Sequence, residues 1–160
     1  MAQQSTSNPS NHAGVFFPPP LLYVPPFLLA WLLQTVLPLP FLPWGIIAVA
    51  AVLFFVVGII LCVWSIGLFR RSNTSLVPVK PTATLVQSGP YQVTRNPMYL
   101  GLLCLYIAVA FWLNLVWALV TIPIVIGIVQ HIVIKKEERY LEQQFGEAYR
   151  QYKAHVRRWI

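Results

Sequence analysis

Two long stretches of the chain, 1–69 and 98–134, contain no Lys, Arg, Asp or Glu. Residues 21–69 of the first stretch and the whole of the second are predominantly apolar. An ionised side chain is costly inside a bilayer, and a helix needs about 20 apolar residues to cross an apolar core roughly 30 Å thick. The pattern therefore predicts an all-α integral membrane protein whose charged residues lie outside the hydrocarbon.

Breaks in these stretches divide them into four predicted membrane spans. Pro38, Pro40 and Pro43 forbid a continuous helix and predict a tight turn, and Asn114 is the expected hinge of a helical hairpin. The first span is short and carries two prolines near its start, so a three-span alternative, in which it only dips into the interface, stays open. The predicted spans are about 21–37, 44–69, 98–113 and 115–134.

The positive charges are confined to two segments of the chain. All eleven Lys and Arg residues lie within 70–95 and 135–158, and an even number of spans places both segments on one side of the membrane. Because cytoplasmic loops carry an excess of Lys and Arg, we expect that side to be the cytoplasm. Residues 1–20 are predicted to form a disordered tail, and residues 21–160 a single membrane domain.

Composition agrees with a membrane protein and argues against other classes. Hydrophobic residues make up 58% of the chain and charged residues 9%, compared with roughly 45–50% and about 25% in soluble domains. The net charge of +7 predicts attraction to anionic lipid headgroups rather than to nucleic acid, since no aromatic and basic binding motif accompanies it. Cys62 and Cys104 fall within spans without metal-ligand spacing, so we expect them to be packing residues.

The residues suited to chemistry lie in the loop 72–97 and in the tail after residue 134. A transporter or channel is expected to carry ionisable groups near the membrane midplane. Among Lys, Arg, Asp, Glu and His, the predicted spans contain only His131, which lies with Gln130 close to the cytoplasmic end of the fourth span. The pattern therefore predicts an active site at the cytoplasmic membrane surface.

In the loop, three consecutive residues predict the start of the third span. Pro97 suits the first turn of a helix because its missing N–H costs nothing there. Asn96 is expected to cap that helix, whose free N–H groups then form a site for a carboxylate or a similar anion. Arg95 adds a planar, permanently charged guanidinium. The same residues also fit a simple anchor, in which Arg95 contacts lipid headgroups and Asn96 only caps the helix.

The tail contains all four acidic residues, and Glu137 and Glu138 follow directly after the fourth span. An acidic pair at the bilayer surface favours a cationic ligand. The apolar positions of the tail predict a cytoplasmic amphipathic helix over 135–156, with an interruption at Gly146. Such a helix is typical of an interfacial membrane anchor.

Four short motifs in the loop and tail resemble one protein family in their order and spacing. The chain resembles the integral membrane methyltransferases of the isoprenylcysteine carboxyl methyltransferase and phospholipid methyltransferase group, over about residues 44–160. The motifs are Gly89-Pro90-Tyr91, Arg95-Asn96-Pro97-Met98-Tyr99, Glu137-Glu138 and Phe145-Gly146-x-x-Tyr149-x-x-Tyr152.

The resemblance implies methyl transfer from S-adenosyl-L-methionine, bound at the cytoplasmic side, to a lipophilic acceptor that enters from the bilayer. The chemistry agrees, because this cofactor has a carboxylate suited to helix-terminal N–H groups and cationic groups suited to Glu137 and tyrosine rings. The residues at the family's cofactor-binding positions are Ala83, Thr84, Leu85, Val86, Tyr91, Asn96, Pro97, Met98, Tyr99 and Glu137.

Two departures from the family pattern concern the acceptor. Family members that methylate prenylated cysteine have a histidine at the position of Asn96. They also have an arginine, near the position of Val133, that holds the substrate carboxylate. The acceptor therefore stays open among an isoprenylcysteine-type carboxylate, a lipid amine and a hydrophobic thiol.

The candidate catalytic residues are Arg95, Glu138 and His131. We expect Arg95 to orient a carboxylate of the acceptor or the cofactor. Glu138 or His131 is the candidate base for an amine or thiol, whereas a carboxylate acceptor needs no base. The alternative to an enzyme is a non-enzymatic membrane anchor or assembly module whose loop and tail bind anionic lipid.

Overall fold

The computed structural model describes residues 18–40, 42–72 and 84–160, and these ranges are helical apart from turns and one isolated bridge. The prediction of an all-α protein is confirmed for this part of the chain. η1 and η2 are 3-10 turns, and η3 is a π-helical turn. In chain order the elements are η1 Pro19–Tyr23, α1 Val24–Val36, α2 Trp44–Arg71, η2 Gly89–Gln92, α3 Pro97–Trp112, α4 Val116–Val120, α5 Ile122–Val129, η3 Gln130–Ile134, α6 Lys135–Phe145 and α7 Glu147–His155.

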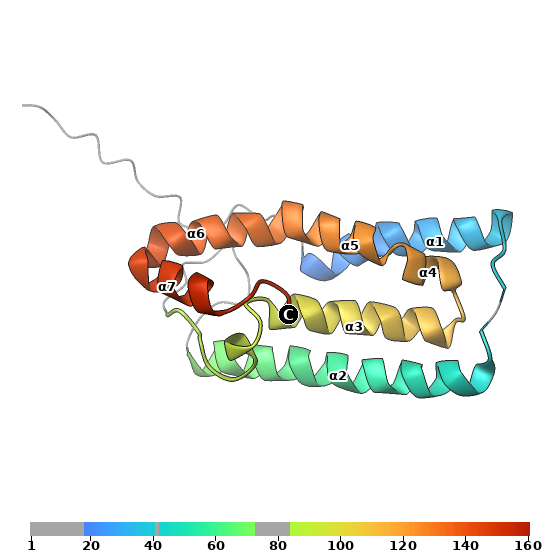
Figure 1. Cartoon of the computed structure of the whole chain (residues 1–160), viewed down its shortest axis with the longest axis horizontal. Coiled ribbons are helices and arrows are strands. Elements are labelled where there is room, and N and C mark those ends of the chain that lie inside the picture. Colours follow the sequence, from blue (N-terminus) through green and yellow to red (C-terminus); the bar gives the residue numbers. More distant parts are fainter. Residues whose placement is uncertain (1–17, 41, 73–83) are drawn as a thin grey trace, which may run out of the picture.

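The long helices α2 and α3 lie side by side (Figure 1), and two glycines bring them close together. A Cβ atom added at Gly58 would lie 2.9 Å from the carbonyl oxygen of Gly101, and one added at Gly101 would lie 3.0 Å from that of Gly58. Any larger residue would therefore push the helices apart. Small residues serve the same purpose between many membrane helices.

At one end of the helical bundle, hydrogen bonds around Asn114 connect the turn between α1 and α2 to the turn between α3 and α4. This residue has a φ of 50° between α3 and α4, which confirms it as the hinge. Its side chain exchanges two hydrogen bonds of 3.1 Å with the backbone of Leu42. Trp117 Nε1 donates a further hydrogen bond of 2.7 Å to the carbonyl oxygen of Leu37. The turn between α1 and α2 is thus tied to the hinge.

The segment of the predicted fourth span, 115–134, is not one regular helix, and its crossing of the membrane stays a prediction. It divides into α4, α5 and η3, with a break at Thr121. Pro123 has no backbone N–H to continue the hydrogen bonding of α4. The hydroxyl of Thr121 lies 3.0 Å from the carbonyl oxygen of Ala118 and 2.8 Å from the hydroxyl of Tyr106, so the break is held by side-chain contacts.

Two helical segments of the described chain are long and apolar enough to cross a membrane, Pro19–Val36 and Trp44–Arg71, whereas Pro97–Trp112 is shorter. Large apolar side chains on their outer surfaces are more than half exposed. Such a surface suits hydrocarbon better than water. The number of four spans stays a prediction. Examples of these exposed side chains are Trp31, Leu32, Trp44 and Val49.

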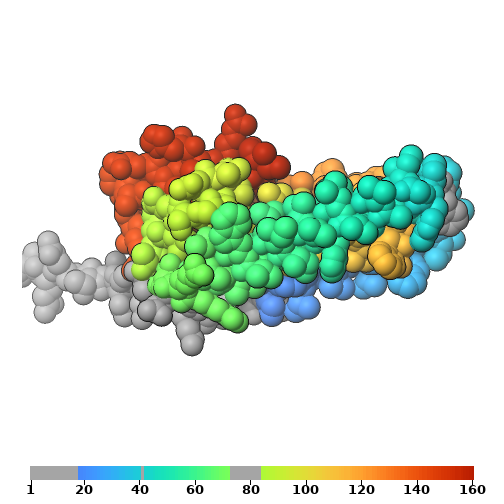
Figure 2. All heavy atoms as spheres, turned by 90° about the horizontal axis from the view of Figure 1, so that it is seen from below, coloured from blue at the N-terminus to red at the C-terminus, as the bar shows by residue number. Residues whose placement is uncertain are grey.

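The segments that carry the polar motifs gather at one end of the molecule. Residues 84–96 lie with α6 and α7 at the end opposite the turn between α1 and α2 (Figures 1 and 2). Gly146, with a φ of 53°, separates α6 from α7. Beyond this interruption α7 turns back, and the chain ends beside the start of α3. Attachment of these two helices to the membrane surface stays a prediction.

Candidate active site

The loop before α3 is fixed to both α2 and α7. It turns at Gly89, which has a φ of 61° that suits glycine, and a Cβ atom there would lie 3.0 Å from Trp64 Nε1. Tyr91 is buried, with its ring edge-on to that of Phe69. The carbonyl oxygen of Tyr91 accepts a hydrogen bond of 2.7 Å from the hydroxyl of Tyr152. These contacts hold the loop at the start of α3.

Tyr99 and Glu137, both expected to contact the cofactor, are in direct contact with each other. The hydroxyl of Tyr99 donates a hydrogen bond of 2.6 Å to Glu137 Oε1, which joins α3 to α6. The backbone oxygen of Tyr99 accepts a hydrogen bond of 3.0 Å from the hydroxyl of Tyr23. Three segments far apart in the sequence therefore meet at one carboxylate.

The pKa of the Glu137 carboxyl is shifted upward. The pKa is raised to about 7: burial is the largest cause, the hydrogen bond from Tyr99 acts in the opposite direction, and the charge of Glu138 adds to the increase. A neighbouring cation would stabilise the ionised form and lower this pKa. Carboxyl groups shifted in this way are frequent at functional sites, and this one is suited to a cationic ligand.

Glu138 is buried between two arginines. Arg158 donates hydrogen bonds to both carboxylate oxygens, from Nε to Oε1 at 2.9 Å and from Nη2 to Oε2 at 2.7 Å. Arg95 Nη1 lies 3.2 Å from Oε1, and the side chains of Arg95 and Glu138 are each 9% exposed. The expected base is therefore held in ion pairs.

The side chain of Asn96 does not cap α3, and this expectation is wrong. Asn96 occupies the N-cap position without a capping hydrogen bond from its side chain. Its Nδ2 donates instead to the carbonyl oxygen of Arg158 at 2.9 Å, and the hydroxyl of Thr94 donates to the same oxygen at 3.1 Å. The cause is the C-terminal chain, which lies against the loop and takes this amide. Pro97 is the first residue of α3, as expected.

The remaining predicted cofactor residues lie in or near the loop. Thr84 is exposed, and Leu85 and Val86 are partly buried in irregular chain before η2. Met98 is partly buried in the first turn of α3. Ala83, the first residue of this set, lies outside the described residues.

His131, the other candidate base, bonds to its own helix. The residue is exposed, and its Nδ1 lies 2.9 Å from the carbonyl oxygen of Gly127. The neighbouring Gln130 accepts a hydrogen bond of 3.1 Å from Trp159 Nε1. Thus Gln130 contacts the C-terminal chain near the cluster, whereas the imidazole of His131 is engaged elsewhere.

Sequence reasoning did not find Arg158, Tyr152 or Thr94 as parts of this site. The basic residues of the tail indicate a headgroup anchor, and no spacing in the sequence links Arg158 to Glu138. The aromatic motif did contain Tyr152, but as a family feature without a partner. α7 brings Tyr152 to the loop that contains Thr94, and the return of the chain after α7 brings Arg158 there.

The fold and the site define an all-helical membrane protein with a charged cluster at one end of its bundle. The chain belongs to the phospholipid methyltransferase family, which matches residues 46–148. It is therefore a membrane methyltransferase, and the resemblance to this group of enzymes is confirmed. The matched range includes Arg95, Tyr99, Glu137 and Glu138 and ends before Arg158.

Part of the chain is also similar to a known protein. The chain is similar to an uncharacterized protein of Haemophilus influenzae, with 43% identity over 63 residues, which are 39% of this chain and the whole of that relative. No solved structure matches the chain.

Proposed function

We propose that the protein transfers a methyl group from S-adenosyl-L-methionine to a lipophilic acceptor, at the membrane surface where α3 and α6 begin. The observation that carries the proposal is the contact between Tyr99 and Glu137 beside the charged cluster of Arg95, Glu138 and Arg158. A carboxylate for a cation thus lies next to a guanidinium for an anion.

The residues present fit the groups of the cofactor. Glu137 suits its ammonium or sulfonium, with the faces of Tyr91 and Tyr99 as further partners for a cation. Arg95 Nε and Nη1 have no hydrogen-bond partner among the described residues, and such donors suit a carboxylate. Partly buried apolar chain such as Leu85 suits the adenine ring. When bound, S-adenosyl-L-methionine supplies a methyl group whose bond to sulfur breaks as the bond to the acceptor forms.

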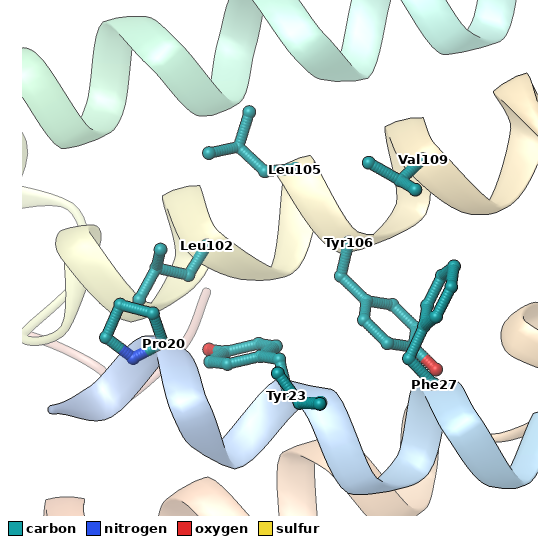
Figure 3. Close-up of a pocket in the computed structure, with 8 residues that line it drawn as sticks. Pro20, Tyr23, Phe27, Leu102, Leu105, Tyr106 and Val109 are labelled. Atoms are coloured by element: carbon teal, nitrogen blue, oxygen red, sulfur yellow. The ribbon is translucent and has the colours of Figure 1, made fainter. Parts of the chain in front are cut away.

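A groove between α1 and α3 supports the lipophilic nature of the acceptor (Figure 3). Its volume is about 270 Å³. The hydroxyl of Tyr23, in its wall, is already bonded to Tyr99, and that of Tyr106 to Thr121. The groove therefore suits the hydrocarbon chain of an acceptor, and Tyr23 connects it to the residue that binds Glu137. The lining residues are Pro20, Tyr23, Val24, Phe27, Leu102, Leu105, Tyr106 and Val109.

The protein's own contribution to the reaction is mainly positioning. Holding an acceptor in line with the methyl group, in a site with little water, lowers the barrier without a covalent step. A carboxylate acceptor attacks without losing a proton, whereas an amine or thiol must lose one. Because Glu138 is paired with Arg158 and His131 with its own helix, the residues around the cluster best suit an acceptor that needs no strong base.

The site is proposed to face the cytoplasm, with both polar segments on that side. Single cysteines at the exposed positions Gln92 and Gln151, in a background that lacks Cys62 and Cys104, are expected to react with a membrane-impermeant thiol reagent only when the cytoplasmic face is accessible. A cysteine at Leu42 is expected to react from the other face. Opposite accessibility of positions 92 and 151 would contradict the proposed topology.

Binding of S-adenosylhomocysteine tests the proposed function. Calorimetric titration of the detergent-solubilised protein is expected to show saturable binding of S-adenosylhomocysteine. ATP, a nucleotide without the amino acid part, is the control and is expected not to bind. A membrane anchor has no reason to bind this product. Absence of binding, in protein that remains folded and monodisperse, would support the anchor and contradict the enzyme.

A further inference from the structure

The last five residues, 156–160, form a C-terminal strap that connects the loop before α3 to η3 and α6. The backbone oxygen of Arg157 accepts a hydrogen bond of 2.9 Å from the backbone N–H of Arg95. Thr94 and Arg157 form an isolated parallel bridge. Trp159 bonds to Gln130 at the start of η3. The strap is therefore fixed by contacts on both sides of Arg158.

Within this strap, Arg158 donates hydrogen bonds to the carboxylate of Glu138. Its two donors reach both carboxylate oxygens in a bidentate pair, the geometry that favours arginine over lysine. Arg95 approaches only Oε1, at 3.2 Å, and forms an ion pair without a hydrogen bond. The two arginines therefore contact Glu138 differently: Arg158 is hydrogen-bonded to it, and Arg95 forms only an ion pair with it.

Arg95 is left with unused donors in a buried position. Its side chain is 9% exposed, and Nε and Nη1 have no hydrogen-bond partner in the part of the chain that the structure describes. Glu138, the one carboxylate that Arg95 contacts, is also bonded to Arg158 through both of its oxygens. A buried cation with free N–H groups is costly unless a counter-ion and acceptor atoms are supplied. The arrangement therefore calls for an anion at Arg95.

We propose that Arg158 is a positioning residue, which holds Glu138 so that Nε and Nη1 of Arg95 remain free to bind an oxyanion of a ligand. The oxyanion is a carboxylate or a phosphate, and it belongs to either the cofactor or the acceptor. This inference rests on the proposed methyl transfer, in which Arg95 touches the ligand and Arg158 acts through Glu138. The strap is thus part of the active site.

The substitution Arg158→Lys tests this role, because lysine keeps the charge but cannot bind both oxygens in the same way. One oxygen of Glu138 is then released, and Arg95 is expected to take it and lose its free donors. We expect kcat/KM for methyl transfer to fall by about tenfold or more, with an unchanged unfolding temperature. Arg150→Lys is the matched control, because Arg150 also binds glutamates but on the exposed surface of α7.

Two ligands identify the source of the oxyanion. If it is the carboxylate of the cofactor, wild-type protein binds S-adenosylhomocysteine more tightly than the decarboxylated analogue, and Arg158→Lys removes most of this preference. If it belongs to the acceptor, the substitution leaves the affinity for S-adenosylhomocysteine unchanged and raises KM or lowers kcat for the acceptor. Either result supports the inference.

A second substitution separates positioning from simple support of the fold. In a Glu138→Gln background the carboxylate that competes for Arg95 is absent, so adding Arg158→Lys is expected to change kcat/KM by less than about twofold. Full additivity of the two effects, or wild-type kinetics in the single variant, would overturn the inference while the proposed function stands. Failure of the proposed function is distinct, since the wild-type protein would then neither bind S-adenosylhomocysteine nor transfer a methyl group.

Discussion

Glu137→Gln is expected to weaken binding of S-adenosylhomocysteine by about ten- to a hundredfold, because it removes the charge-assisted contact with the ammonium of this ligand, worth roughly 1.5–3 kcal/mol. The substitution keeps the size of the side chain and an oxygen that can accept the hydrogen bond from Tyr99. Folding should therefore change less than affinity. Calorimetric titration at about pH 8, where the carboxyl is mostly ionised, measures the effect.

The pH dependence of binding gives an internal check on this role. Burial raises the pKa of Glu137 to about 7, so the carboxyl is neutral below that pH and cannot pair with a cation. Affinity is expected to fall as the pH decreases below about 7, by up to about tenfold per pH unit, and this slope should disappear in Glu137→Gln. Tyr99 and Glu138 face the same carboxyl, and so does Tyr91, whose pKa burial raises above its ordinary value.

The matched control for Glu137 is Glu142→Gln on the same helix. Glu142 pairs with Arg150 and Lys153 at the surface, and its loss is expected to leave the dissociation constant unchanged. An equal effect of the two substitutions, or an unchanged dissociation constant for Glu137→Gln, would place Glu137 on a solvated face rather than in the cofactor site.

Arg95→Lys is expected to abolish most methyl transfer while the protein still inserts into membranes and folds. Both side chains are cationic, but only the guanidinium offers a rigid pair of donors to an oxyanion. The loss appears mainly in kcat if the contact tightens in the transition state, and mainly in KM if it holds both states equally. Steady-state kinetics with labelled S-adenosyl-L-methionine measures the difference.

Two further variants separate this role from a contact with lipid headgroups. Arg139→Lys changes an exposed arginine of α6 and is expected to leave transfer unchanged. Near-normal activity for Arg95→Lys, together with a defect in Arg95→Ala that added anionic lipid relieves, would favour a headgroup anchor and remove Arg95 from the site.

The sequence predicts the helices well where proline or an apolar run decides the structure. The third span, expected at about 98–113, is Pro97–Trp112, and the second, expected at about 44–69, is Trp44–Arg71. Absence of charge sets the length of each helix, and proline sets its start. The break at Thr121 was not predicted, although Pro123 marks it in the sequence, because the apolar run continues on both sides of these residues.

The candidate site is predicted in part, because local motifs can be recognised in a sequence whereas long-range contacts cannot. Motifs at the starts of α3 and α6 identify Tyr99 and Glu137, which the structure joins by a hydrogen bond. The partner of Asn96 is a backbone oxygen of the strap, and a backbone group has no signature in the sequence. The prediction that Asn96 caps α3 was wrong for this reason. The basic residues of the tail likewise did not indicate that Arg158 contacts Glu138.

The most direct test of the central claim is methyl transfer into lipid. Membranes that contain the wild-type protein are incubated with S-adenosyl-L-methionine labelled in its methyl group, and the lipid extract is resolved by mass spectrometry. The expected result is a methylated lipophilic product that membranes containing Glu137→Gln form far more slowly at limiting cofactor. If the wild-type membranes give no labelled product beyond that of membranes without the protein, across carboxylate, amine and thiol acceptors, the proposed activity is contradicted.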